Sequence, residues 1–147
     1  MTRIDFYILE GDKSGNREQF ACRIAEKAYR LGHGVYIHTG DAGRSAKLDE
    51  LLWTFKQGSF IPHAIDGQSP DPDAPVLIGH LAELDVSSHA KGREVLINLA
   101  QEIPLFFSSF ERVAEIIDQE AENKTKGRER FRFYRDRGYS MKTHTIS

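Results

Sequence analysis

The sequence predicts an α/β protein: a single-domain, doubly wound, mainly parallel sheet of Rossmann-like topology with helices on both faces, spanning residues 1–147. Short apolar runs typical of buried strands alternate along the chain with longer segments whose apolar residues recur every three or four positions. Strands that alternate with helices form units in which the strands lie parallel. A length of 147 residues is enough for one domain with a substantial core.

The first half of the chain predicts two strand–helix units. Residues 4–9 and 35–39 are mostly apolar and predict strands. Residues 16–31 predict the first helix, which ends at Gly32, and residues 41–55 predict the second. The apolar positions that define these helices are Phe20, Ile24, Ala28 and Leu31 in the first, and Leu48, Leu51, Leu52 and Phe55 in the second.

The middle of the chain predicts two further strands with irregular connections. An extended connector over residues 63–75 carries three of the five prolines and leads into a strand at residues 75–78. Residues 80–93 are polar and predict a loop, and the apolar run 94–99 predicts the fourth strand.

The last third predicts one strand and the longest helix. Residues 105–110 predict a helical turn, and residues 112–117 predict the fifth strand. Asp118 is a suitable N-cap for a helix that runs to Arg137, and Gly138 ends it.

Charge is distributed unevenly along the chain. The formal net charge is only −2, but residues 124–147 carry eight Lys or Arg side chains against two acidic ones. This segment therefore has a charge of about +6 and the preceding 123 residues about −8, which favours a basic face offered to an anionic partner.

Motifs for catalysis, metals and cofactors are missing from the sequence. The turn 11–15 follows the first strand, where a phosphate loop would lie, but Asp12 precedes Lys13 and the glycine spacing is wrong. The six histidines lack metal-ligand spacing, and the lone Cys22 fits a small core residue. We therefore predict no catalytic residue, no metal site and no cofactor. Without a signal peptide or a long apolar run, the sequence predicts a cytoplasmic protein that does not associate with membranes.

Two large aromatic residues flank the end of the second predicted helix. Trp53 is the only tryptophan, and Phe60 follows it in the segment that leads to Pro62 and His63. Large aromatic side chains bury much area both in cores and in docking patches, so both roles stay open for this pair.

A row of basic residues follows one face of the last predicted helix. Lys124, Arg128 and Arg132 are spaced i, i+4, i+8, and Phe131 and Tyr134 lie beside them. Basic residues near a helix end can simply complement the helix dipole, but Lys124 and Arg128 lie far from that end. The row fits an acidic peptide, a terminal carboxylate or a nucleic-acid backbone. A sequence pI of about 6.3 favours the acidic peptide over nucleic acid.

Over essentially its whole length the chain resembles the chi subunits of the bacterial DNA polymerase III holoenzyme, accessory proteins of the clamp loader. The matching segments are FYIL (6–9), LDELLW (48–53), SFIPH (59–63), APV (74–76), LINL (96–99), RERFRFYR (128–135) and GY (138–139). The resemblance implies a non-catalytic adaptor, although the polymerase holoenzyme of which chi is a subunit is an enzyme.

The resemblance implies that the last helix binds the acidic C-terminal tail of single-stranded DNA-binding protein. The basic positions matched to this role are Lys124, Arg128 and Arg132. Phe131 and Ile117 match positions that line the pocket for the terminal apolar side chain of the tail. Phe131 stands where a tyrosine is common, and Arg132 where a lysine occurs.

The resemblance also implies that Trp53 and Phe60 engage the psi subunit of the clamp loader, or a helicase that competes for the same patch. Contact with nucleic acid would then be indirect. Two other functions stay open: direct binding of single-stranded nucleic acid through the basic C-terminal helix, and a nucleotide-dependent enzyme using the turn 11–15.

Overall fold

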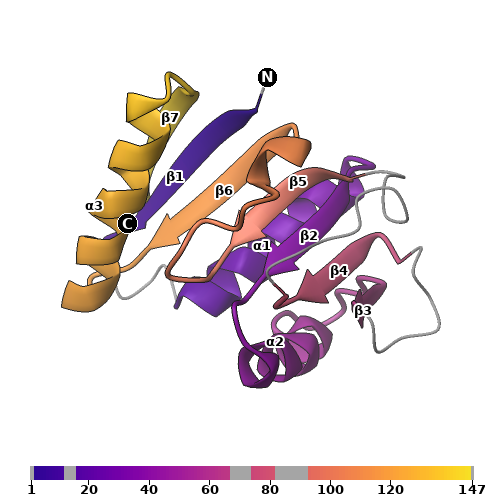
Figure 1. The fold of residues 1–147 in the computed structure, drawn as a ribbon. Coiled ribbons are helices and arrows are strands. Elements are labelled where there is room, and N and C mark those ends of the chain that lie inside the picture. The colour runs from indigo at the N-terminus through magenta and orange to yellow at the C-terminus, as the bar shows by residue number, and fades with distance from the viewer. Residues whose placement is uncertain (1, 12–15, 67–73, 82–92, 147) are drawn as a thin grey trace.

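The structure is a computed structural model that describes residues 2–11, 16–66, 74–81 and 93–146, and these residues form one open parallel sheet with α-helices on both faces (Figure 1). The strand order is β3-β4-β2-β5-β6-β1-β7, and every neighbouring pair is parallel. The predicted fold class is confirmed. The strands are β1 (Arg3–Leu9), β2 (Gly34–His38), β3 (His63–Ile65), β4 (Val76–Gly79), β5 (Arg93–Asn98), β6 (Arg112–Ile117) and β7 (Ser140–Ile146). The helices are α1 (Arg17–Arg30), α2 (Ala42–Thr54) and α3 (Ala121–Asp136), with a 3-10 turn at Phe107–Ser109.

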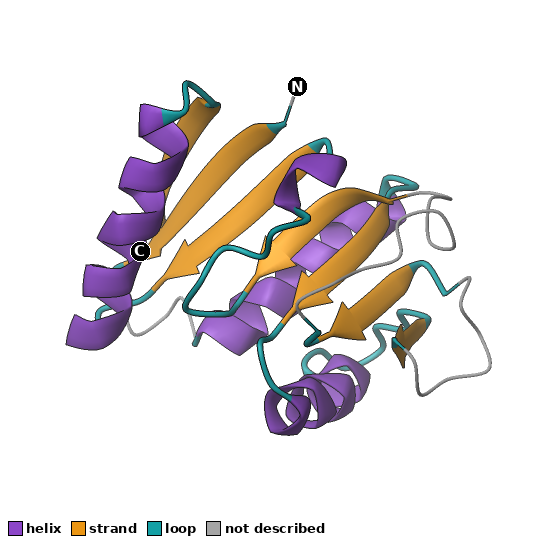
Figure 2. Ribbon diagram, in the orientation of Figure 1, coloured by secondary structure: helices purple, strands orange, loops and turns teal. Residues whose placement is uncertain are grey.

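Helices cover both faces of the sheet (Figure 2). Successive side chains of a strand point to opposite faces, so Val35 and Ile37 of β2 belong to the cluster under α1 and α2, while Tyr36 belongs to the cluster under α3. The cluster under α3 also contains side chains from the segment between β5 and β6, including Phe106 and Phe110. The sheet therefore has one buried cluster on each face, as expected of a doubly wound fold.

Two strands were not predicted from the sequence. Strand β3 lies within the predicted connector, where three residues pair with β4 next to Pro62 and leave too short an apolar run to recognise. Strand β7 has the polar sequence SMKTHTI and lacks the apolar run that marks a buried strand. It is a strand because it pairs along its length with β1.

The start of α3 also differs from the prediction. The N-cap position is Glu120 rather than Asp118, and its side chain makes no capping hydrogen bond. The Asp118 carboxylate instead accepts hydrogen bonds from the Glu120 backbone N–H at 3.1 Å and from Asn123 Nδ2 at 2.9 Å. Most of the turn 11–15, of the connector 63–75 and of the predicted loop 80–93 lies outside the described residues.

A buried carboxylate holds the C-terminal strand β7 in place. Asp5 of β1 is 3% exposed; its Oδ1 lies 3.1 Å from His144 Nε2, and its Oδ2 accepts a hydrogen bond from Arg112 Nη2 at 3.0 Å. The His144 ring also stacks on Tyr7 with a centroid distance of 4.8 Å. Burial acts to raise the pKa of Asp5, but the hydrogen bonds to His144 and Arg112 outweigh it, so the pKa lies below the ordinary 3.8.

We expect Asp5→Asn to lower the free energy of unfolding by about 1–2 kcal/mol at pH 7, because partly exposed partners weaken these charged hydrogen bonds. Because folding lowers the pKa of Asp5, its ionised carboxylate stabilises the fold at pH values above the pKa of the unfolded chain. This stabilisation is lost as the pH falls through the lower pKa of the folded protein. The difference in free energy of unfolding between wild type and Asp5→Asn should therefore shrink as the pH is lowered from 5 to below 3.8. Urea unfolding at each pH measures this difference. Asp136→Asn, at an exposed site, is the control and should change little. An equal difference at pH 7 and pH 3 would contradict the assignment.

Candidate functional site

A buried polar network fixes how α3 lies on the sheet. Glu115 of β6 is fully buried and accepts hydrogen bonds from Arg130 Nε at 2.8 Å, from Tyr134 Oη at 2.8 Å and from Asn98 Nδ2 at 3.0 Å. Arg130 Nη1 also donates to the Gln101 carbonyl oxygen at 2.9 Å. Burial, followed by the Glu115 charge, raises the pKa of Tyr134, which stays protonated as the donor. The network turns the Arg130 side of α3 inward and its opposite side outward.

This network was not predicted from the sequence. The available signal is the acidic Glu115 in the middle of the otherwise apolar run VAEII. A charge at a core-facing strand position needs a buried partner, but the sequence does not say which basic residue of α3 supplies it.

A glycine allows α3 to approach the sheet closely at one point. A Cβ atom added to Gly127 would lie 2.4 Å from Ile117 Cδ1, so a larger residue would require the Ile117 side chain or the helix to shift. Ile117 lies beneath this turn and is 8% exposed. It therefore packs between β6 and the turn of α3 that carries Lys124 and Arg128.

The three predicted basic residues face outward from α3. Arg128 and Arg132 are exposed and form no ion pair with any residue that the structure describes. Lys124 is half-buried, and its Nζ donates to Gln119 Oε1 at 3.2 Å. We call Lys124, Arg128 and Arg132 the basic row. Because its guanidinium groups lack nearby carboxylates in the described part of the chain, the row is available to an external anion.

The two aromatic residues beside the basic row behave differently. Phe131 is half-buried and packs edge-on against Phe6 of β1, with a centroid distance of 5.3 Å. Tyr134 is fully buried in the Glu115 network and offers no surface. Only Phe131 of the pair borders the row.

Trp53 and Phe60 form an exposed patch rather than part of the core. Their side chains are 51% and 77% exposed, and their rings meet edge-to-face with a centroid distance of 5.6 Å. This exposure excludes the core role that the sequence left open for the pair. We call it the Trp53–Phe60 patch.

Hydrogen bonds under the patch hold it to α2. The side chain of His63 is fully buried, and Trp53 lies on it with a centroid distance of 4.4 Å. His63 Nδ1 lies 2.7 Å from the Ile61 carbonyl oxygen, and Nε2 lies 3.0 Å from the carbonyl oxygen of Asp49. His63 thus supports the patch from beneath.

The loop before Phe60 is tied to α1. Ser59 Oγ donates to a carboxylate oxygen of Glu26, and Lys56 Nζ lies 3.2 Å from the other oxygen. The Ser59 hydrogen bond, helped by the charges of Lys56 and Arg30, holds the pKa of Glu26 below its ordinary value. The patch is therefore presented on an anchored support.

The structure does not bring the basic row and the Trp53–Phe60 patch together. The patch lies on α2 beside β3 and β4 at one edge of the sheet, whereas α3 lies near β6 and β7 toward the other edge and on the opposite face (Figure 1). The two surfaces can therefore be occupied at the same time.

The described residues offer no metal cluster, no readily ionised thiol and no membrane-spanning helix. They contain no group of three His, Cys, Asp or Glu side chains placed to hold a metal ion. Cys22 is fully buried, and burial followed by the Glu18 charge raises the pKa of its thiol to about 12. No helix in the described ranges has the length and apolar character needed to span a membrane.

Comparison with solved structures identifies the same architecture in T4 UvsW. The similarity has a TM-score of 0.66 at 10% sequence identity and covers 99% of this chain, which spans 41% of the UvsW chain. At this identity the match concerns the fold alone.

Sequence comparisons identify much more similar relatives, all named DNA polymerase III subunit chi. The relative from Pseudomonas aeruginosa is 42% identical over 146 residues, covering 99% of this chain and 98% of the relative. The relative from Escherichia coli is 32% identical over 149 residues and 99% of each chain, and that from Haemophilus influenzae is 30% identical over 141 residues, 96% of this chain and 95% of the relative. The family model for the DNA polymerase III chi subunit, HolC, matches residues 1–142. The chain therefore belongs to the DNA polymerase III chi subunit family.

Proposed function

We propose that this protein is a non-catalytic adaptor of the DNA polymerase clamp-loader complex. In this proposal the basic row binds the acidic C-terminal tail of single-stranded DNA-binding protein, and the Trp53–Phe60 patch binds the psi subunit. The supporting observation is the pair of separate exposed surfaces, one cationic and one aromatic, on a protein of the chi family.

The chemistry of the basic row suits an acidic tail with a free carboxylate. Arg128 can donate two parallel hydrogen bonds to that carboxylate, a geometry that lysine does not reproduce. Lys124 and Arg132 lie one turn to either side and would attract the aspartates of the tail through longer-range interactions that salt weakens.

An apolar contact would supply the salt-insensitive part of the binding. In this proposal the terminal aromatic side chain of the tail packs beside Phe131 and near Ile117. Burying that side chain contributes about 1.5–3 kcal/mol. Because a flexible tail must also be ordered, we expect an affinity in the micromolar range, about −7 to −8 kcal/mol.

The proposed partner of the other surface is the psi subunit, and a helicase that competes for the Trp53–Phe60 patch is the alternative. Exposed aromatic rings on an anchored support, such as those of Trp53 and Phe60, are typical of interface hot spots. Either partner would need an apolar side chain that packs against the exposed faces of the two rings.

Direct binding of single-stranded nucleic acid is the second candidate function. The guanidinium groups of Arg128 and Arg132 favour it, since neither forms an ion pair with a described residue. Against it, the first 123 residues carry a charge of about −8, which repels a polyanion. Titration with an unmodified oligonucleotide at several salt concentrations distinguishes this function, because phosphate contacts give a steep salt dependence.

We expect Arg128→Ala to weaken tail binding at least about tenfold, because a charged hydrogen-bonded pair is lost. The measurement is fluorescence anisotropy of a labelled acidic peptide ending in Ile-Pro-Phe, and amidating its C-terminus should cause a similar loss. Lys126→Ala is the matched control, because Lys126 lies on the same helix but off the basic row and pairs with Glu129 at 3.7 Å. The control should change affinity by less than about twofold.

Failure of the wild-type protein to bind this peptide at low salt would reject the role proposed for the basic row. An equal loss in Lys126→Ala and Arg128→Ala would indicate attraction by net charge alone.

A further inference from the structure

The face of the sheet that α1 and α2 cover is left open at one edge. Helix α1 packs on β2, β5 and β6, and α2 packs on β3 and β4. Strands β1 and β7 lie beyond α1, and no helix in the described part of the chain covers them on this side (Figure 1). Because successive side chains of a strand point to opposite faces, the register places six side chains here. We call them the β1–β7 face: Arg3, Asp5, Tyr7, Lys142, His144 and Ile146.

Three rings form a row across this open edge. The Tyr7 ring contacts Phe20 of α1 at a centroid distance of 5.4 Å and His144 of β7 at 4.8 Å. The planes of Tyr7 and His144 differ by only 18°, so the two rings stack. The His144 side chain is 40% exposed, and its ring face turned away from Tyr7 is therefore open to solvent. Such a flat surface is suitable for stacking another ring.

Basic side chains outnumber acidic ones around these rings. Two cavities of about 710 and 110 Å³ share Tyr7, Ile24 and Lys27 as wall residues. The basic side chains of the cavity walls and the β1–β7 face are Arg3, Arg23, Lys27, Lys56, Arg112 and Lys142. The acidic ones are Asp5 and Glu26, and both already have hydrogen-bond partners within the protein. The acidic excess of the first 123 residues therefore does not extend to this surface.

Several of these cations have no partner of opposite charge. Arg23, Lys27 and Lys142 are exposed and form no ion pair with any residue that the structure describes. The Arg23 guanidinium lies 5.3 Å from the centre of the Phe20 ring, next to the row of rings. Exposed cations beside an open aromatic ring are available to an anionic ligand that also contains rings.

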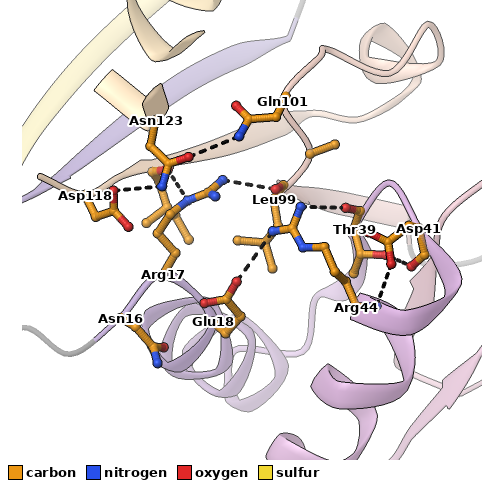
Figure 3. A network of polar contacts seen from close by, with 12 residues as sticks. Asn16, Arg17, Glu18, Thr39, Asp41, Arg44, Leu99, Gln101, Asp118 and Asn123 are labelled. Carbon is orange, nitrogen blue, oxygen red and sulfur yellow. Dashed lines mark hydrogen bonds and ion pairs between the residues drawn. The ribbon is translucent and has the colours of Figure 1, made fainter. Parts of the chain in front are cut away.

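Two other arginines next to the sheet are already engaged. Arg17 donates to the carbonyl oxygens of Ile116 and Leu99, each at 3.0 Å. Arg44 Nη1 donates to the Thr39 carbonyl oxygen at 3.1 Å, and Figure 3 shows both guanidinium groups turned toward the ends of the strands. These arginines hold the strand ends, so the cations available on this side of the sheet are those beside the β1–β7 face.

We propose that the β1–β7 face binds single-stranded nucleic acid, with a base stacked on His144 and phosphates paired with Arg23, Lys27 and Lys142. Every base has a flat π-face, so stacking on aromatic rings combined with a cationic surface recognises single strands without regard to sequence. The bases of a duplex are stacked on one another and cannot reach such a ring. An acidic peptide would use the cations but would leave the open His144 ring without a role.

The test is fluorescence anisotropy of a labelled oligothymidylate of about 15 nucleotides, titrated with the full chain at several salt concentrations. We expect saturable binding at low salt, with log K falling against log salt by about 0.7 for each phosphate contact. Replacing two exposed cations, in Lys27→Gln with Lys142→Gln, should weaken binding at least about fivefold and reduce that slope by about 1.4. Lys47→Gln, at an exposed position of α2, is the control and should leave the affinity unchanged.

A matched pair of variants at His144 tests base stacking separately from folding. Both His144→Phe and His144→Leu lose the hydrogen bond to Asp5, but only His144→Phe keeps an aromatic ring. We expect His144→Leu to bind the oligonucleotide at least about fivefold more weakly than His144→Phe. Equal affinities of these two variants would overturn the assignment to nucleic acid.

Absence of saturable binding by wild type at low salt would overturn the proposal. So would loss of binding in Arg128→Ala but not in Lys27→Gln with Lys142→Gln, because the oligonucleotide would then occupy the basic row on the opposite face. Displacement by polyglutamate as effective as by unlabelled oligothymidylate would also overturn it, since charge alone would then explain binding. The proposal does not depend on tail binding, which the Lys27 and Lys142 variant should retain.

Discussion

We expect Glu115→Ala to lower the free energy of unfolding by about 3–5 kcal/mol, since it leaves a buried guanidinium without its counter-ion. The side chains of Glu115 and Arg130 are 0% and 4% exposed, so water cannot replace the lost partner. The Oη of Tyr134 also loses its acceptor, and Nδ2 of Asn98 keeps only the Glu102 carbonyl oxygen. Urea unfolding followed by circular dichroism measures the change.

Two further variants test the cause of this loss. Replacing both members of the pair, as in Glu115→Leu with Arg130→Met, should recover much of the stability, because no buried charge then remains unpaired. Glu129→Ala breaks an exposed pair with Lys126 on the same helix and should change stability by less than about 0.5 kcal/mol. A loss in the double variant as large as in Glu115→Ala would show that the network contributes by packing rather than by charge pairing.

The same network connects core stability with the basic row. Arg130 and Tyr134 attach α3 to β6, and the outward direction of Arg128 and Arg132 follows from that attachment. We therefore expect Glu115→Ala to weaken tail binding as well. The double variant Glu115→Leu with Arg130→Met should bind the tail as wild type does only if α3 keeps its place on the sheet.

Strands and helices were predictable wherever the sequence itself is apolar and periodic. Strands β1, β2, β4, β5 and β6 and helices α1 and α2 begin and end close to the predicted positions. Strands β3 and β7 were not predictable, because the first is three residues long and the second is polar and defined by its pairing with β1. Parallel pairing between residues far apart in sequence has no local signal.

The candidate surfaces were predictable only in part, for a related reason. The spacing of Lys124, Arg128 and Arg132 predicts that they share a helix face, and they do. Spacing cannot say which neighbouring aromatic ring turns inward; Tyr134 does so because Glu115 accepts its hydroxyl hydrogen bond. Similarly, the exposure of Trp53 depends on where β3 places His63 beneath it, which the sequence does not reveal.

We expect Trp53→Ala to weaken binding of the proposed partner by about 30- to 1,000-fold, corresponding to about 2–4 kcal/mol for a central aromatic hot spot. Its ring is half-exposed, rests on the buried His63 and borders Phe60, so it can insert into a partner without rearrangement of its support. Phe60→Ala should cause a smaller loss, because its ring is 77% exposed and has fewer neighbours that hold it in place. Calorimetric titration with the purified psi subunit measures both effects.

Controls separate a specific patch from general apolar attraction. Leu31→Ala removes an exposed apolar side chain at the end of α1, where it is 67% exposed, and should leave psi affinity unchanged. Trp53→Ala should also keep wild-type affinity for the tail peptide, because the basic row lies on the opposite face of the sheet. If Trp53→Ala binds psi as tightly as wild type, the patch serves another partner, and the competing helicase becomes the next protein to titrate. If Trp53→Ala loses both psi and the tail peptide, the two surfaces are coupled through the fold, which contradicts their proposed independence.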